Sequence, residues 1–157
     1  PDWILAKLKS WDLTHPHTKW IAKRAARTLI KAGHKPALTL FNFGGKPAVK
    51  VSDFKVTPAR LKLGQALEFS FSLISTTRKA QSLAVDYIIH YVKASGGTAP
   101  KVFKLRELTL ASGGKQVIRK RQTIRNFTTR RHHAGRHRVE IQINGLLLAQ
   151  GQFILSL

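Results

Sequence analysis

The sequence contains no cysteine and no methionine, and only 7 of its 157 residues are Asp or Glu. The absence of cysteine excludes a disulfide framework and a Cys-based zinc site. No apolar run approaches the roughly 18 residues that a membrane-spanning helix needs, and no secretory signal pattern is present. Because the chain begins with proline and has no initiator residue, we expect a fragment or a processed product.

Positive charge is in large excess, with 28 Lys and Arg and a formal net charge of +21. A surface this basic repels itself, and a polyanionic partner would neutralise it. Nucleic acid is the commonest such partner, because phosphate neutralisation releases counterions and gives affinity independent of base sequence. Simple solubility, a ribosomal protein and a membrane-surface protein are the other interpretations. Because 43% of the residues are hydrophobic, the chain is not a disordered basic tail.

The pattern of apolar residues changes at Gly44-Gly45, from helical periodicity before it to alternation after it. Three helices are predicted in the first part, over residues 2–11, 17–32 and 36–42. Pro16 fits the first turn of the second helix, and Gly33 fits its C-terminal stop. We therefore predict a helical repeat unit over 1–45 and a second, all-β domain over 46–157. The two longer of these helices bury little core alone, so we expect the first part to belong to a longer array.

The predicted helix over 17–32 has two different faces. Small apolar residues occupy one arc: Ile21, Ala22, Ala25, Ala26, Leu29 and Ala32. The opposite arc carries a basic stripe of Lys19, Lys23, Arg24, Arg27 and Lys31. Like charges at i, i+4 spacing repel each other unless a partner offsets them. Trp20 falls within the basic stripe, where it either stacks on a nucleic acid or packs on a neighbouring helix.

Seven strands are predicted after Gly45, over residues 48–56, 66–75, 82–94, 101–110, 115–124, 137–145 and 146–155. The run 66–75 alternates cleanly between apolar and polar residues, whereas 82–94 is apolar on both faces, as a central strand is. Asp53 is expected at a bend, and Asn144-Gly145 is expected to form a tight hairpin turn. Seven short strands in this length predict an immunoglobulin-like β-sandwich.

The segment 119–138 contains eight Lys and Arg residues and no acid. Alternation places Arg119 and Arg121 on one face of a strand. The loop that follows gathers further cations at one end of the sandwich, and Arg130, Arg131 and Arg136 are the preferred contacts. Arginine forks match phosphate oxygens and also enter a narrow minor groove. A solvated loop is the alternative.

Catalytic and metal-binding patterns are scarce. His133 and His137 have zinc spacing only on a helix, but their segment is predicted as loop and strand, and arginines surround it. Asp86 and His90 are too far apart along a strand for a hydrogen-bonded pair, so Asp86 is expected to pair with a surface Lys or Arg. Asp12 is expected to be a cap or turn residue. We predict no catalytic residue, no metal and no cofactor in this chain.

Several segments resemble one family. Residues 17–38 (HTKWIAKRAARTLIKAGHKPAL) resemble the last HEAT-like repeat of AlkC-type DNA alkylation repair glycosylases. Residues 51–76, 85–105 and 128–145 resemble the immunoglobulin-like domain that follows this repeat in many of those proteins. The resemblance covers nearly the whole chain and joins its two halves in the same order.

The resemblance implies a DNA glycosylase that removes cationic N-alkylated bases such as 3-methyladenine. In that family the catalytic carboxylate lies in earlier repeats, so no catalytic residue is carried over, and the basic stripe is carried over as backbone contacts. It further implies double-stranded DNA as partner, a monomer, and a cytoplasmic location with the bacterial nucleoid. Two other functions stay open: a non-enzymatic nucleic-acid-binding module, and an interaction domain for an acidic protein or an anionic membrane.

Overall fold

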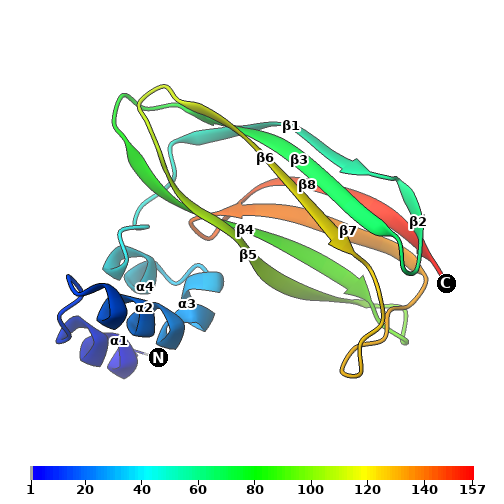
Figure 1. Cartoon of the computed structure of the whole chain (residues 1–157), viewed down its shortest axis with the longest axis horizontal. Coiled ribbons are helices and arrows are strands. Elements are labelled where there is room, and N and C mark those ends of the chain that lie inside the picture. The colour runs from blue at the N-terminus through cyan, green and yellow to red at the C-terminus, as the bar shows by residue number, and fades with distance from the viewer. Residues whose placement is uncertain (1) are drawn as a thin grey trace.

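The computed structural model describes residues 2–157, which form four short helices followed by eight strands (Figure 1). The helices are α1 (Asp2–Lys9), α2 (Pro16–Ala25), α3 (Arg27–Lys31) and α4 (Lys35–Leu40). The strands are β1 (Val49–Thr57), β2 (Arg60–Lys62), β3 (Ala66–Ser75), β4 (Gln81–Val92), β5 (Thr98–Leu110), β6 (Lys115–Thr123), β7 (Gly135–Ile143) and β8 (Leu146–Ser156). Helices therefore precede strands, as the change in periodicity predicted.

Local chemistry explains two helix ends. Pro16 occupies the first turn of α2, where a missing N–H costs nothing. Gly33 follows α3 with a φ of +71°, and its N–H donates to the Ile30 carbonyl at 3.0 Å. The next N–H, of His34, donates to the Leu29 carbonyl at 2.9 Å. This Schellman arrangement requires a left-handed residue, which glycine supplies without strain, so Gly33 is confirmed as the stop.

The predicted helix over 17–32 is divided at Ala26, whose φ of −86° and ψ of 2° separate α2 from α3. Beyond this break, the Lys31 carbonyl accepts a hydrogen bond of 3.0 Å from the Gln142 side chain of β7. Contacts with the strands thus fix the position of α3. The periodicity of one segment carries no information about such a distant partner.

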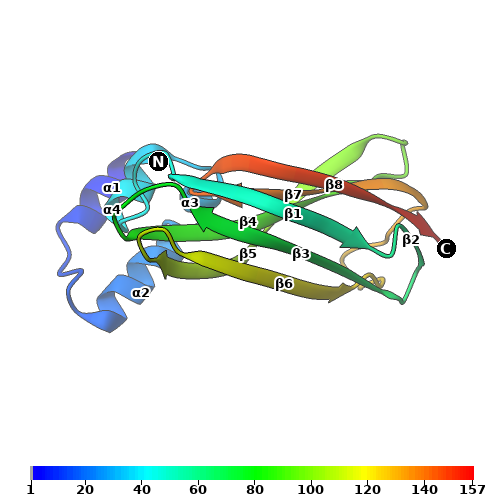
Figure 2. The same ribbon diagram turned by 90° about the horizontal axis from the view of Figure 1, so that it is seen from above.

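The strands form two sheets, ordered β1-β3-β6 and β2-β8-β7-β4-β5 (Figure 2). Neighbouring strands are antiparallel except for β2, which pairs in parallel with β8. The short β2 is the strand beyond the seven that the sequence predicted. It has three residues, which are too few to show an alternating pattern. The two-sheet sandwich itself is confirmed.

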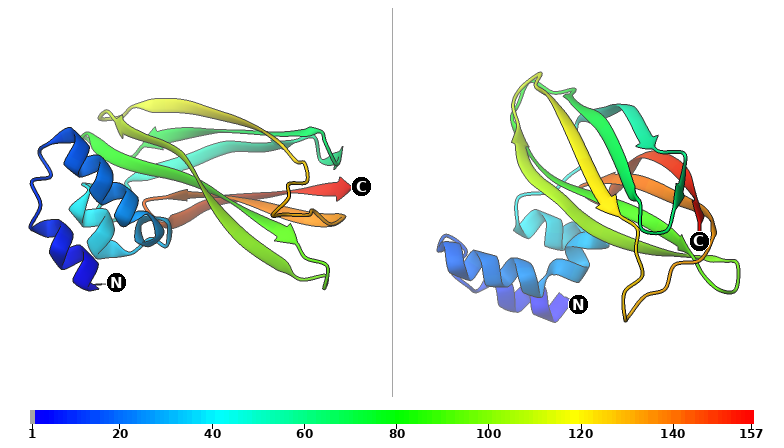
Figure 3. Two further views of the ribbon diagram at one scale, coloured as in Figure 1. Left: turned by 60° about the horizontal axis from the view of Figure 1, so that its bottom comes forward. Right: turned by 45° about the vertical axis from the view of Figure 1, so that its right-hand side comes forward.

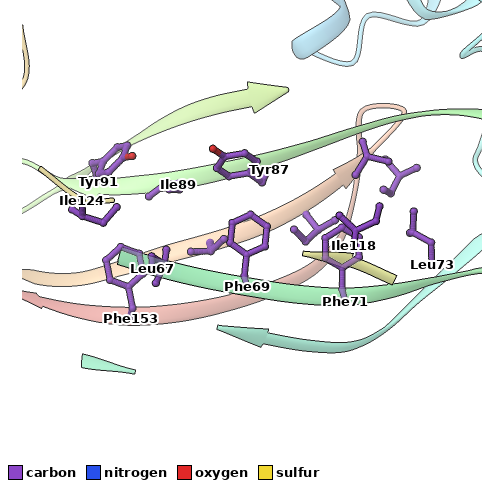
Figure 4. Packing of buried hydrophobic residues seen from close by; sticks show 14 of the residues in the cluster. Leu67, Phe69, Phe71, Leu73, Tyr87, Ile89, Tyr91, Ile118, Ile124 and Phe153 are labelled. Carbon is purple, nitrogen blue, oxygen red and sulfur yellow. The ribbon is translucent and has the colours of Figure 1, made fainter. Parts of the chain in front are cut away.

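The main core lies between the two sheets (Figure 4). Strand β3 contributes the four residues that alternation placed on one face, each at most 2% exposed: Leu67, Phe69, Phe71 and Leu73. Strand β4 faces them with Leu83, Val85, Tyr87, Ile89 and Tyr91. Burying a side chain of this size stabilises the fold by about 1.5–3 kcal/mol, so this layer dominates the stability of the sandwich.

A second, smaller core joins the helices to the sandwich. It contains apolar side chains from α1, α2 and α4 together with Ala84 of β4. Ala84 points away from the main core, so the helices cover one end of the outer face of the five-stranded sheet (Figure 3). Strand β4 is therefore covered on both faces, as its continuous apolar run predicted. Within residues 2–157, no helix is long and apolar enough to cross a membrane.

Three turn predictions are confirmed. Asp53 has a φ of +56° and lies within a register shift between β1 and β3, which is the expected bend. Asn144 and Gly145 have φ values of +47° and +79°, as a tight hairpin turn between β7 and β8 requires. Asp12 accepts a 3.0 Å hydrogen bond from the Thr14 backbone N–H, so it is a turn residue.

Candidate nucleic-acid interface

The cations of the basic stripe fall into two main groups, those that bind strand β5 and those that are exposed to solvent. The Lys23 Nζ lies 2.8 Å from the Glu107 Oε2 of β5. The Lys31 Nζ donates to the Val102 carbonyl of the same strand at 2.6 Å. These two lysines therefore attach the helices to β5. Lys19 is half-buried in a shallow groove beside Lys23 and Glu107. Arg24 and Arg27 are the exposed cations of the stripe, and Trp20 beside them is exposed as well.

Glu107 binds two lysines from different parts of the chain. Its Oε1 lies 2.8 Å from the Lys104 Nζ, and its Oε2 binds Lys23 at the same distance. Burial opposes ionisation of Glu107, but the hydrogen bonds from Lys104 and Lys23 prevail and lower the pKa of the carboxyl. The carboxylate is therefore a fixed counter-charge between α2 and β5.

A pocket of about 190 Å³ lies where α2 and α3 meet β4 and β5. Asp86 lines it and is only 5% exposed. It forms none of the salt bridges among residues 2–157, so the predicted pairing with a surface cation is wrong. Burial raises the pKa of Asp86 to about 6, although the charges of Lys31 and Lys104 oppose the shift. The cations around this pocket are Lys23, Arg24, Arg27, Lys31, Lys104 and Arg106.

The segment 124–134 connects β6 to β7 at the far end of the sandwich. Phe127 and Arg130 pair through their backbones, with N–H···O distances of 2.8 and 3.1 Å. The Arg130 guanidinium lies over the Tyr91 ring at 4.9 Å. Arg131 and Arg136 are exposed. The predicted cluster at the sandwich end therefore contains two exposed arginines and one that rests on an aromatic ring.

A group on the outer face of the five-stranded sheet was missed by sequence reasoning. Glu140 of β7 is buried, and its Oε2 lies 2.8 Å from the His90 Nε2 of β4. The Arg138 Nε lies 2.8 Å from the Glu140 Oε1, and this arginine is half exposed. Glu140 thus holds an arginine and a histidine side by side. The register between β4 and β7, which the sequence does not reveal, brings them together.

Arg119 and Arg121 share one face of β6, as alternation predicted, and both are exposed. Arg121 lies 3.4 Å from Glu68 of β3. Because β6 belongs to the three-stranded sheet, these two arginines lie on the opposite side of the sandwich from the helices (Figure 3). The structure therefore does not join them to the basic stripe.

The histidines of the segment 132–137 pack inside the sandwich rather than around an open site, and the half-buried His133 contacts His137 through its backbone carbonyl at 3.1 Å. His137 is fully buried and stacks on Phe153, with ring centroids 4.9 Å apart and planes 9° apart. His132 is buried against Tyr91. Burial lowers the pKa of both imidazoles, so each packs as a neutral ring. Residues 2–157 contain no group of three His, Cys, Asp or Glu side chains that could hold a metal ion.

The helices and the segment 124–134 project to the same side of the sandwich (Figures 1 and 3). They flank the outer face of the five-stranded sheet, which carries Arg136 and Arg138. The side between them is therefore bordered by cations from the helices, the sheet and the connecting segment. Such a distribution suits a long polyanion better than a small ligand.

These features define the class of the protein. It is a basic module in which short helices pack against an immunoglobulin-like β-sandwich. Residues 50–157 match the family described as "Uncharacterised protein YhaZ, C-terminal Ig-like domain", and the chain belongs to that family. "Uncharacterized protein YhaZ" of Bacillus subtilis (strain 168) is 38% identical over 135 residues. That match covers 86% of this chain and 37% of the relative.

A solved structure matches the whole chain. It is the Pseudomonas fluorescens alkylpurine DNA glycosylase AlkC bound to DNA containing an abasic site analog. The identity is 46% and the TM-score 0.97, covering 100% of this chain and 44% of AlkC. The resemblance to AlkC-type proteins is thus confirmed. A β-glucosidase from Erythrobacter marinus matches at 17% identity and a TM-score of 0.60, over 69% of this chain and 15% of its own. This second likeness shows the fold alone.

Proposed function

We propose that this chain is the DNA-binding portion of a glycosylase that removes cationic alkylated bases of the 3-methyladenine type. In this proposal it grips the phosphate backbone of double-stranded DNA in the bacterial cytoplasm. The observation that carries the proposal is the 46% identity, over the whole chain, to a glycosylase bound to DNA. Because the chain spans 44% of that protein, excision is proposed for a whole protein of that kind.

The chemistry of such an enzyme requires little from this portion. A base alkylated on a ring nitrogen already carries positive charge, so it leaves without an acid. The remaining need is a carboxylate that stabilises the oxocarbenium-like sugar. The carboxylates of the buried Asp86 and Glu140 and of the half-buried Glu107 each face cations of the chain itself. We therefore expect this chain alone to release 3-methyladenine from DNA only at the spontaneous rate, and faster release would contradict this division of labour.

The proposed contact surface is the side of the sandwich between the helices and the segment 124–134. Exposed cations there neutralise phosphates from several directions, which gives affinity without base recognition. The proposed contacts are Trp20, Arg24, Arg27, Arg130, Arg131 and Arg136. Lys19, Lys23 and Lys31 stay predicted contacts, although the last two already bind β5. Arg119 and Arg121 stay predicted contacts for DNA on the opposite side.

The test measures affinity for random-sequence duplex DNA as a function of salt. Log affinity should fall linearly with log salt, by about 0.9 for each phosphate neutralised. Replacing Arg130, Arg131 and Arg136 together by Ala should weaken binding and flatten this slope. The matched control replaces three exposed cations that no prediction assigns to DNA, Lys46, Arg78 and Lys79. A separate double variant of Arg119 and Arg121 tests the opposite side.

The outcomes separate the possible functions. Equal slopes for wild type and the first triple variant would remove the segment 124–134 from the interface. A flat salt response of the wild type would contradict backbone binding and favour an interaction domain for another partner. Tight binding to anionic vesicles without binding to duplex DNA would favour the membrane alternative.

A further inference from the structure

An aromatic pocket lies at the open edge of the sandwich. It is separate from the pocket where α2 and α3 meet β4 and β5. The edge strands β5 and β6 belong to different sheets, and the segment 124–134 crosses between those sheets at one end. The pocket encloses about 390 Å³ and is lined from β4, β5, β6 and this segment. Its lining residues are Tyr91, Lys101, Phe103, Gln122, Thr123, Phe127, Thr128, Thr129, Arg130 and His132.

The inner wall of the pocket is rigid. The Tyr87 hydroxyl donates to the Gln122 Oε1 at 2.6 Å, and the Gln122 Nε2 donates to the Tyr91 hydroxyl at 3.3 Å. In Figure 4 the two tyrosine hydroxyls point toward one another from the same strand. Two buried tyrosines therefore hold the Gln122 amide in one orientation. Each tyrosine uses one of the two bonding positions on the amide oxygen and nitrogen, so one acceptor lone pair and one N–H remain for the polar edge of a ligand.

The outer wall is an aromatic ring presented to solvent. Phe127 is 51% exposed, and the Arg125 guanidinium lies over its ring, 5.1 Å from the ring centre. Two hydrogen bonds with the Arg130 backbone fix the backbone of Phe127, so the ring is attached to a well-defined turn. Thr128 and Thr129 form the tip of the same turn and line the pocket. The fold thus maintains an exposed ring next to hydrogen-bonding groups.

The electrostatics of the pocket are wholly positive. Arg130 lies over the Tyr91 ring, and the Lys101 Nζ lies 5.2 Å from the centre of the Phe103 ring. No Asp or Glu lines the pocket. A matching ligand therefore combines a planar face, polar edge groups and negative charge.

A nucleotide has these three properties, because its base stacks on aromatic rings and its phosphate binds Arg and Lys. A paired base within a duplex has both faces stacked on its neighbours and is unable to enter. We propose that this pocket binds one unpaired nucleotide of a DNA strand, with Phe127 as the stacking platform and Gln122 at the base edge. This gives the sandwich a single-strand site in addition to the duplex surface, and it does not depend on the glycosylase proposal.

The test uses the 157-residue chain and a short single-stranded oligodeoxynucleotide with 2-aminopurine in place of one base. Binding should quench the 2-aminopurine fluorescence, because the base stacks on a protein ring. Phe127→Ala should weaken binding to the single strand by at least about fivefold and abolish the quenching. It should leave affinity for a blunt duplex within twofold, since the side chain carries no charge. Gln122→Ala should weaken single-strand binding without abolishing the quenching.

The matched controls are Val117→Ala on β6 and Arg78→Ala, at an exposed cation that no prediction assigns to DNA. Val117 is 53% exposed and lies outside the pocket, so its loss should change neither affinity. Arg78→Ala removes a cation and should not affect quenching. Parallel losses of single-strand and duplex affinity in Phe127→Ala would show that the ring only positions the segment, and would overturn the proposal. Wild-type quenching in that variant would overturn it as well, as would equal competition by an acidic peptide that contains tyrosine.

Discussion

Gly33 and Gly145 touch backbone to backbone at the junction of the helices and the sandwich. A Cβ atom added to Gly33 would lie 3.1 Å from the Gly145 Cα, and one added to Gly145 would overlap the Gly33 Cα. Gly33 ends α3, and Gly145 completes the β7–β8 turn, each with positive φ. Each glycine is therefore required both for its local turn and for the close approach between the two parts of the chain.

This contact predicts an unequal effect of two similar substitutions. Gly145→Ala should displace the helices and lower the free energy of unfolding by more than Gly113→Ala. Gly113 also has positive φ in a turn between strands, but nothing lies within 4 Å of its added Cβ. Both variants incur the left-handed strain of roughly 1–2 kcal/mol, so their difference reports the clash. Urea unfolding and protease cleavage between α4 and β1 measure it, and equal destabilisation would contradict it.

The sequence allowed prediction of both turns but not of the contact between them. Gly33 and Asn144-Gly145 follow from local rules for helix ends and hairpins. Their meeting depends on how the helices pack against the outer face of the five-stranded sheet. The same limit applies to Lys23: a helical wheel places it on a polar face, but it does not show that Glu107 lies opposite.

The buried polar groups show a second limit. The continuous apolar run of β4 predicted that this strand is covered on both faces, and this is confirmed. It did not predict that Asp86 lies under α3, or that His90 and Arg138 share Glu140. These relationships depend on strand register, and each strand alone is compatible with several registers.

Because Lys23 binds Glu107 whereas Arg24 is exposed, we expect their Ala variants to differ in stability and in the salt dependence of DNA binding. Lys23→Ala removes a lysine that binds Glu107, so it should lower the free energy of unfolding by about 0.2–1 kcal/mol. It should reduce the salt slope of duplex binding less than Arg24→Ala does, because Glu107 already neutralises this lysine. Arg24→Ala removes an exposed guanidinium that lies over the Trp20 ring, and it should reduce the salt slope by about 0.9. Denaturant titration and DNA titration of both variants test this. A reversed order of the two slopes would show that Lys23 leaves Glu107 when DNA binds.

Asp86 predicts a pH-dependent cost in stability. Its pKa is about 6 in the folded protein against an ordinary 3.8, so the folded state retains a proton that the unfolded chain releases. Stability should therefore fall as pH rises from about 4 to about 6. Asp86→Asn avoids this ionisation and should raise the free energy of unfolding by about 1–3 kcal/mol at pH 7.5, with little gain at pH 4. Glu68→Gln, on an exposed side chain, is the control. An equal effect of Asp86→Asn at both pH values would contradict this prediction.

The buried His137 predicts the opposite pH dependence. Burial lowers its pKa below the ordinary 6.5, so the unfolded chain takes up a proton before the folded protein does. Its contribution to stability is complete above pH 6.5 and should decrease as the pH falls below that value. His137→Phe keeps a flat ring on Phe153 but is unable to titrate. The difference in Tm between pH 7.5 and pH 5.5 should therefore be smaller in this variant, whatever its absolute stability.

His17→Phe, on the exposed side of α2, should retain the wild-type difference. Because Asp86 titrates in the same range with the opposite sign, both histidine variants are best compared in the Asp86→Asn background. There, an unchanged pH difference in His137→Phe would show that the imidazole is protonated equally in the folded and unfolded states.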